Sequence, residues 1–245
     1  SNPSRNRSIL VGLIRDLASP LATRFELRSP NPHSNVYLTM ATSYMAMLDG
    51  ILYAVNNNKS QDDLLAEISK KSGEAADYLE KDREYRSEED VFEAFSDEER
   101  DKYFGKAPAT IYENISALAK YPEKVQVLKR NDVLTEQLIN SVKMAVTNRW
   151  ILEISHRVLN SYGDKIRGYK ALHSVDKVLD LDITNWTNIN NLRVYLMKDT
   201  YTNKSLFTRI KEAFDKKDLE LASNLYIELE EKMEELRKLY SSYKR

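Results

Sequence analysis

The 245-residue sequence contains no cysteine and only three histidines, which are His33, His156 and His173. The lack of cysteine excludes disulfide scaffolds, thiolate zinc sites and cysteine nucleophiles, and three scattered histidines do not make a histidine-rich metal site. Six glycines and six prolines are few for a β-sandwich or a β-barrel. The composition therefore favours long helices.

Neither sign of charge predominates, because 37 basic and 38 acidic residues give a net charge of −1. This balance argues against a strongly basic nucleic-acid-binding protein, and no nucleic-acid partner is expected. No apolar run reaches the roughly 18 residues that a membrane span needs, so no membrane partner is expected. The polar opening, with Ser1 and Asn2, does not resemble a signal peptide, and we predict a cytoplasmic protein.

The charges divide the chain into three predicted regions. Residues 1–58 carry five arginines, no lysine and three acids. Residues 59–106 carry nine bases and sixteen acids, which is typical of a solvated acidic connector. Residues 107–245 carry 23 bases and 19 acids in amphipathic patterns, which predicts a helical bundle.

Two apolar or alternating segments near the start predict a short β-hairpin. Residues 8–13 (SILVGL) form a candidate buried strand, and residues 24–28 (RFELR) alternate strictly between charged and apolar side chains. Residues 35–55 have helical spacing and are apolar nearly all round, with Asp49 as the only charge, which is typical of a buried or interfacial helix. Asn35 is the predicted N-cap.

The rest of the chain reads as helices. Ser60, Ser87 and Ser96 are predicted caps, and Pro108 is placed in the first turn of a helix that ends near residue 120. A long helix is predicted from residue 135 to Gly163, with an inward face of Leu138, Val142, Ala145, Val146, Trp150, Ile154 and Leu159. The last helix, residues 219–243, carries an apolar face of Ala222, Leu225, Tyr226, Leu229, Met233, Leu236 and Tyr240. The predicted fold class is mainly α, with a short N-terminal β-hairpin followed by a multi-helix bundle.

The first region concentrates side chains that suit a phosphorylated ligand. Arginine guanidinium groups suit bidentate recognition of phosphate, and one carboxylate among them suits a divalent cation. Arg24, Glu26 and Arg28 share one face of the second strand, and Arg5 and Arg7 precede the first strand. The alternative interpretation is a solvated strand face on which Glu26 forms a salt bridge with its neighbours.

Four linked motifs carry a resemblance to a known family. They resemble, in order and spacing, the C-terminal end of the glutamine synthetase catalytic domain. The motifs are RNRS at 5–8, RFELRSPNP at 24–32, NVYL at 35–38 and MLDGI at 47–51.

The resemblance implies roles for individual residues. Glu26 would be a ligand of the divalent ion, Mg²⁺ or Mn²⁺. Arg28 and Arg7 would be catalytic, and Arg7 and Arg24 would contact ATP, while glutamate and ammonia would be the substrates. Gly12 stands where many members carry a further arginine, and a degenerate synthetase is the interpretation that this departure favours.

The resemblance also implies a domain organisation. Residues 1–58 would be a C-terminal remnant of the catalytic domain, 59–106 an acidic helical connector and 107–245 a helical bundle extension. Because the family's other metal-binding glutamates find no match, we expect a fragment of a longer synthetase that is inactive by itself. The alternative is a helical oligomerisation or partner-binding module without catalysis, and a homo-oligomer is expected.

Overall fold

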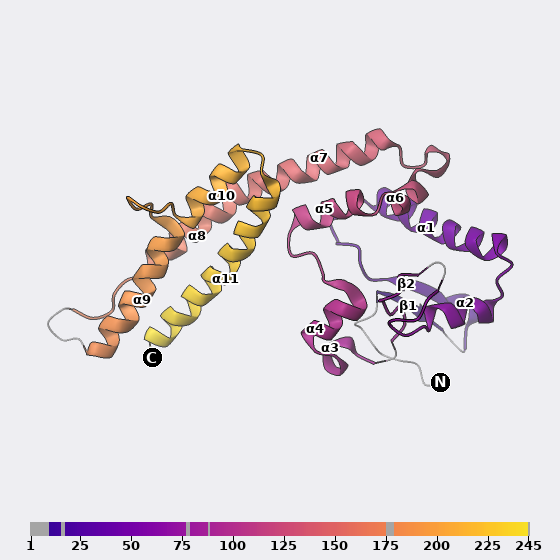
Figure 1. Ribbon diagram of the computed structural model, residues 1–245, viewed down its shortest axis with the longest axis horizontal. Coiled ribbons are helices and arrows are strands. Elements are labelled where there is room, and N and C mark those ends of the chain that lie inside the picture. Colours follow the sequence, from indigo (N-terminus) through magenta and orange to yellow (C-terminus); the bar gives the residue numbers. More distant parts are fainter. Residues whose placement is uncertain (1–9, 16–17, 77–78, 88, 175–178, 245) are drawn as a thin grey trace. The chain divides into compact units, whose positions relative to one another are not determined.

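A computed structural model describes residues 10–15, 18–76, 79–87, 89–174 and 179–244. The described residues are mainly helical with one two-stranded antiparallel sheet near the N-terminus, which confirms the predicted fold class (Figure 1). They form two compact units. One comprises Ser1–Ala107 with Glu123–Glu136, and the other comprises Pro108–Pro122 with Gln137–Arg245.

The first unit contains the hairpin, one long helix and several short helices. Its strands are β1 (Val11–Ile14) and β2 (Arg24–Leu27). Its helices are α1 (Val36–Asn56), α2 (Gln61–Ile68), α3 (Val91–Ala94), α4 (Asp97–Arg100), which continues as a π-helical turn (Asp101–Gly105), and α6 (Pro122–Lys129), followed by a 3₁₀ turn (Arg130–Asp132).

The hairpin pairs two strands that the alternation and apolarity predicted. β1 runs antiparallel to β2, with Gly12 opposite Glu26 and Ile14 opposite Arg24. The Arg28 backbone N–H extends the pairing by donating to the Leu10 carbonyl at 3.0 Å. Part of the predicted first strand, residues 8 and 9, lies outside the described residues.

Helix α1 begins where the sequence predicted, because the Asn35 side chain accepts hydrogen bonds from the N–H groups of Tyr37 and Leu38. Met45 is the one buried residue of the helix, so the burial or interface that its apolar sequence predicts is not provided by the unit itself. Over the described residues α1 is also the helix whose length and mean hydropathy of 1.2 would suffice to cross a membrane. Every 18-residue window of this helix contains Thr39, Ser43 and Asp49, so it is not an uninterrupted apolar run. The finding is weak evidence for a span, because soluble core helices meet the same criteria.

The predicted N-caps are confirmed where the capping side chain forms hydrogen bonds with residues of the first helical turn. Ser60 and Ser96 each form a capping box with the acid three residues later. Ser87 instead accepts from the Glu89 N–H in a turn, and Asp90 caps the next helix. The Pro108 prediction is wrong by one turn, because Thr110 is the N-cap.

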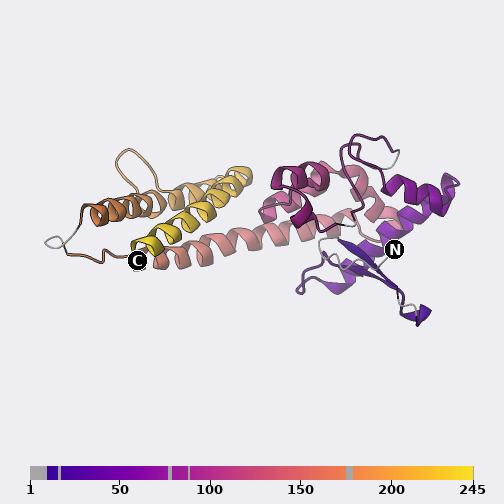
Figure 2. The ribbon, with the colours of Figure 1, turned by 90° about the horizontal axis from the view of Figure 1, so that it is seen from below.

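The second unit is a bundle of longer helices, and α9, α10 and α11 lie side by side in it (Figures 1 and 2). One helix continues without a break through α7, a π-helical segment and α8. The elements are α5 (Ile111–Lys120), α7 (Glu136–Leu152), the π-helical segment (Glu153–Val158), α8 (Leu159–Gly168), α9 (Asp180–Met197), α10 (Leu206–Asp215) and α11 (Leu219–Tyr243).

Gly163 does not terminate the long helix, contrary to the prediction. It lies buried inside α8, and the Arg167 guanidinium covers it, 3.4 Å from where a Cβ would stand. The predicted inward face of this helix is wrong in its first half, where Leu138, Val142 and Val146 are exposed. Burial begins at Trp150, which packs between other rings of the bundle.

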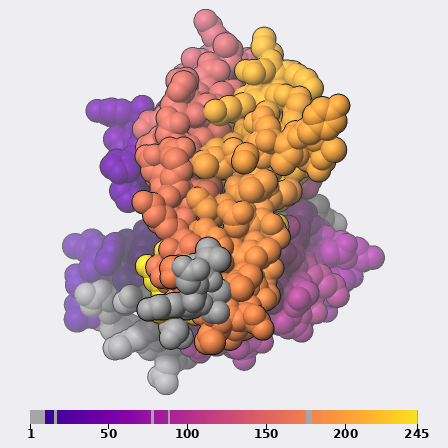
Figure 3. Space-filling view, turned by 90° about the vertical axis from the view of Figure 1, so that its left-hand side faces the viewer, coloured from indigo at the N-terminus to yellow at the C-terminus, as the bar shows by residue number. Residues whose placement is uncertain are grey.

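The core of the second unit lies between the long helix of α7 and α8 and helices α9, α10 and α11. Figure 3 shows an outer face of this unit, where the salmon atoms of the long helix lie beside the orange atoms of α9. The predicted apolar face of α11 is confirmed, with Tyr226 the one member that is only partly buried. Thr110 and Ser223 add a buried polar contact, with their hydroxyl oxygens 2.6 Å apart. Fully buried residues include Ile166, Ile189, Leu196, Leu206, Ile210, Leu229 and Leu236.

Candidate functional site

The candidate site lies on one face of the hairpin. Successive side chains of a strand alternate between its two faces, so Arg24, Glu26 and Arg28 share one side. The strand register adds Gly12 to that side, directly across from Glu26. The sequence thus predicted the shared face of the three charged residues, and pairing brings Gly12 among them.

Without a ligand, the charged face is held by an ion pair. The Arg28 Nε donates to the Glu26 Oε1 at 3.2 Å, and both side chains are partly exposed. Arg24 points elsewhere, because its guanidinium donates to the Ala22 carbonyl at 3.2 Å in the turn between the strands. The structure therefore brings Glu26 and Arg28 together but not Arg24, and Arg7 lies outside the described residues.

Gly12 makes room for Arg28. A Cβ on Gly12 would stand 3.3 Å from a terminal nitrogen of the Arg28 guanidinium, which lies across the strand over the glycine. A longer side chain at position 12 would have to displace that guanidinium. Gly12 therefore provides the space in which Arg28 meets Glu26.

The described residues do not by themselves fit a divalent metal ion. Glu26 contributes one carboxylate, whereas Mg²⁺ requires six oxygen ligands in octahedral geometry. Within the described ranges, no group of three or more histidine, aspartate or glutamate side chains is close enough to hold an ion. Glu26 can serve as one ligand only where further oxygens come from outside this part of the chain.

The MLDGI motif has a partner that sequence reasoning missed. The Asp49 carboxylate on α1 accepts a hydrogen bond from Arg130 at 3.2 Å, across 81 positions of sequence. Arg130 follows α6, and its second terminal nitrogen is buried without a hydrogen bond among the described atoms. No local pattern signals this pair, since it depends on the return of residues 123–136 to the first unit.

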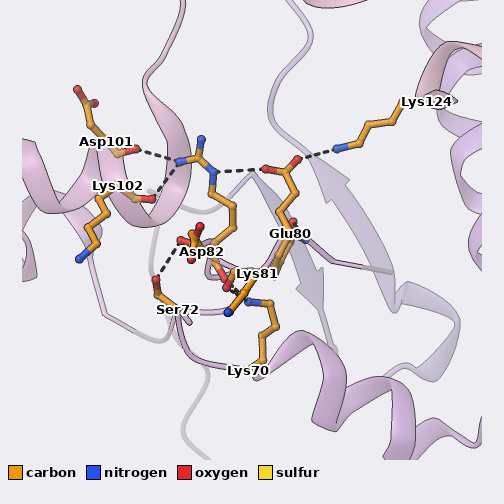
Figure 4. A network of polar contacts seen from close by, with 10 residues as sticks. Lys70, Ser72, Glu80, Lys81, Asp82, Asp101, Lys102 and Lys124 are labelled. Atoms are coloured by element: carbon orange, nitrogen blue, oxygen red, sulfur yellow. Dashed lines mark hydrogen bonds and ion pairs between the residues drawn. The ribbon is translucent and has the colours of Figure 1, made fainter. Parts of the chain in front are cut away.

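A buried lysine organises the acidic segment that follows α2 (Figure 4). Lys70 is 6% exposed, and its ammonium donates to the Lys81 and Arg83 carbonyls at 2.8 and 2.7 Å. Two charge-assisted hydrogen bonds satisfy much of the donor capacity of this ammonium. Lys70 is therefore a structural residue that fixes the loop carrying Arg83.

Arg83 extends the same network to the π-helical turn. Its guanidinium donates to the Asp101 and Lys102 carbonyls at 2.9 and 3.0 Å, and so satisfies acceptors at a helix end. Glu80 lies between Arg83 and Lys124, whose ammonium is 2.9 Å away. The hydrogen bond from Lys124 is the main reason that the pKa of Glu80 lies below its ordinary value. A hollow of about 480 Å³ lies against α2 and the turn after it rather than beside the hairpin.

Comparison with known proteins assigns a class to the segment that carries this site. Residues 3–103 match the family model described as "Glutamine synthetase, catalytic domain". The matched model is of the same family that the four motifs resemble, and all four motifs lie within the matched residues. The match continues through α4, well past the last of the four motifs.

Particular relatives are bacterial glutamine synthetases. The chain is 36% identical over 111 residues to "Glutamine synthetase" of Vibrio cholerae, and 37% identical over 111 residues to that of Salmonella typhimurium. In both comparisons the match covers 41% of this chain and 23% of the relative, so the chain spans about a quarter of the length of these relatives. No solved structure matches the chain.

Proposed function

We propose that the first unit supplies the C-terminal part of a glutamine synthetase active site, in which ATP drives the ligation of ammonia to glutamate through a glutamyl phosphate. The observation that carries the proposal is the pairing of Glu26 with Arg28 on one hairpin face, inside the matched segment. The reaction needs charge neutralisation more than covalent chemistry from the protein, and that face supplies charges of both signs.

Each site residue has a proposed role that the family resemblance implies and that its side-chain chemistry suits. Arg28 and Arg7 neutralise charge on the transferring phosphoryl group, and Arg7 and Arg24 contact the ATP phosphates. Glu26 is one ligand of the Mg²⁺ or Mn²⁺ ion, which supplies charge neutralisation on the phosphates when it is bound. In the absence of ligands Glu26 neutralises Arg28, so the guanidinium exchanges one anionic partner for another when phosphate arrives.

The 245-residue chain is proposed to be inactive by itself. One carboxylate cannot hold the ions that the reaction needs, and the described residues offer no cluster that completes the set. Activity would require the portion of a synthetase that lies outside the matched segment. A cytoplasmic location, predicted from the sequence, accords with the use of ATP.

Complementation tests the proposal. The chain is co-expressed with the V. cholerae relative from which the matched segment has been removed, and glutamine formation is measured. We expect turnover with the wild-type chain, and a loss of about 100-fold or more with Glu26→Gln or Arg28→Gln, because each removes a group that faces the developing charge. Glu231→Gln, at an exposed position of α11, is the matched control and should keep full turnover. Turnover by the isolated chain, or complementation that is indifferent to Glu26→Gln, would contradict the proposal.

A second candidate function concerns the helical unit. It has a hydrophobic core of its own and lies beyond the residues that match the synthetase model, which favours an oligomerisation or partner-binding role. Light scattering of the full chain tests this candidate. A mass of two or more chains that survives Glu26→Gln supports it, and a monomer at every concentration speaks against self-association.

A further inference from the structure

Helix α1 presents a continuous apolar stripe that its own unit leaves exposed. The members recur at steps of three or four residues, so they lie along one face of the helix. Their exposed fractions run from 49% for Met40 to 81% for Tyr37. We name this set the α1 stripe, and its members are Tyr37, Met40, Tyr44, Met47, Ile51 and Val55.

The other side of α1 is already anchored by the first unit. Met45 is buried, the Asp49 carboxylate is bound by Arg130, and the Tyr53 hydroxyl donates to Glu67 on α2 at 3.2 Å. These three contacts fix the rotation of the helix about its axis. The α1 stripe therefore faces away from the unit because the opposite side of the helix is held by these contacts.

The size and composition of the stripe are those of an interface. At 1.5 Å per residue, the 19 residues from Tyr37 to Val55 extend for about 27 Å. The stripe has no charged member, and it is rich in tyrosine and methionine, which are enriched at protein interfaces. Exposed apolar surfaces that extend over several turns are typical of interaction sites.

The hairpin of the same segment shows a second uncovered apolar face. Val11, Leu13, Phe25 and Leu27 lie opposite the charged face, and all four are exposed. A two-stranded hairpin is at best marginally stable unless further strands or a helix cover it. Both uncovered surfaces belong to residues that match the synthetase catalytic domain.

These observations select one occupant. The matched segment corresponds to 23% of the V. cholerae relative, so most of that protein's polypeptide lies outside the match. The apolar face of α11, in contrast, is already buried against its neighbours in the second unit. We propose that the α1 stripe is the surface on which the remaining catalytic portion of a synthetase docks, an inference that rests on the proposed function.

The test measures binding rather than catalysis. The full chain is co-expressed with the V. cholerae relative lacking its matched segment, and the purified material is examined by size-exclusion chromatography with light scattering. We expect a complex of the two chains with the wild type. Ile51→Lys and, as a second variant, Tyr44→Lys place a charge in the stripe and should weaken the complex at least 100-fold.

Thr42→Lys is the matched control, because Thr42 is an exposed residue on a different face of the same helix. It should bind like the wild type, and circular dichroism should show equal helix content in all variants. Retention of the complex in both stripe variants would overturn the inference. So would insolubility of the truncated relative in the presence of the wild-type chain.

Two other occupants give distinct results, and each would overturn the inference. Dimerisation of the chain alone that Ile51→Lys abolishes would assign the stripe to a second copy. Binding to vesicles of phosphatidylcholine and phosphatidylglycerol that Ile51→Lys abolishes would assign it to a lipid surface. The docking inference and the proposed function can fail independently. A complex that forms without glutamine synthesis would support the docking surface and contradict the proposed function. Glu26→Gln should abolish turnover while the complex still forms.

Discussion

Helices α1 and α11 share the helical spacing of their large apolar residues but differ in how far those residues are buried. Both place large apolar residues at steps of three and four, yet the face of α11 is buried against α9 and α10 while the α1 stripe is exposed. Leu229 and Leu236 are fully buried, whereas Ile51 and Val55 are more than half exposed. Large apolar residues at helical spacing therefore predict that a face needs to be covered, but they do not indicate whether the same chain provides the cover.

The difference in burial between the two helices is tested most directly by truncating one apolar side chain of each. Leu229→Ala should lower the free energy of unfolding of the second unit by about 3 kcal/mol, because it leaves a cavity in a closed core. Ile51→Ala should change stability by less than about 0.5 kcal/mol, because its side chain is largely in water. Chemical denaturation followed by circular dichroism measures both.

The control for helix propensity is Leu221→Ala, an exposed position on α11. It removes the same atoms as Leu229→Ala without opening a cavity, so a much smaller loss is expected. Equal losses at positions 51 and 229 would mean that α1 is buried as deeply as α11 in solution, and the contrast between the helices would collapse.

A second prediction concerns the first unit, where few apolar side chains are buried and the hydrogen bonds of Lys70 are expected to contribute to stability. Lys70→Met keeps the length of the buried side chain but removes the Lys70 donor from the Arg83 carbonyl and leaves the Lys81 carbonyl with the Gly73 N–H. A cost of about 2 kcal/mol is expected, because two charge-assisted hydrogen bonds are lost. Hydrogen exchange of residues 81–84 and of the turn after α4 should accelerate together.

Lys71→Met is the control, since the Lys71 ammonium is mostly exposed and is held, among the described residues, by an ion pair with Glu84 at 3.5 Å. Faster exchange in Lys71→Met than in Lys70→Met would show that the buried network does not hold this segment.

A third prediction concerns alkaline pH in the second unit. The pKa of Tyr162 is raised to about 12 by burial and by its hydrogen bond to the Glu230 carboxylate, and the same causes raise the pKa of Tyr226. Because the native pKa exceeds the ordinary value of 10, the stabilisation is fully present below pH 10 and is lost as the pH rises through about 12.

Glu230→Gln removes one cause of the shift, so tyrosinate absorbance should appear at lower pH than in the wild type. Glu231→Gln, one position along the same helix, should leave the titration unchanged. If both variants titrate alike, the Glu230 carboxylate does not influence the two phenols.

The smallest expected effect lies at the start of α10. The Asp199 carboxylate accepts from the Ser205 N–H at 2.8 Å and from the Thr208 hydroxyl at 3.1 Å, and these bonds lower its pKa. A lowered native pKa gives stability that is present above the ordinary value of 3.8 and is lost as the pH falls through the native value. Thermal melts should therefore show a difference between wild type and Asp199→Asn at pH 6 that shrinks at pH 3.

What the sequence could predict was local. Asn35, Ser60 and Ser96 cap helices with side-chain bonds to neighbours at most three residues away, and the residue pattern alone reveals such bonds. The Ser87 prediction failed because Ser87 bonds Glu89 in a local turn while Asp90 caps the helix, and the Gly163 prediction failed because the helix continues through the buried glycine. The same limit applies to the candidate site.

At the site, strict alternation predicted that Glu26 and Arg28 share a face, and the structure pairs them. The space that Gly12 provides for Arg28 depends on strand register, which the sequence does not state. The pair of Asp49 with Arg130 and the bonds from Lys70 join distant positions, and no short-range pattern encodes them.

The order in which the chain visits its two units has a consequence for how such a protein could arise or be divided. The chain leaves the first unit after Ala107, contributes α5 to the second, returns for residues 123–136 and then leaves again. A single cut between the synthetase-like residues and the helices would therefore remove Lys124 and Arg130 from Glu80 and Asp49. The two units therefore cannot be separated cleanly by one cut, because a gene fusion or a protease acting at one junction would leave the first unit without two of its own ion pairs.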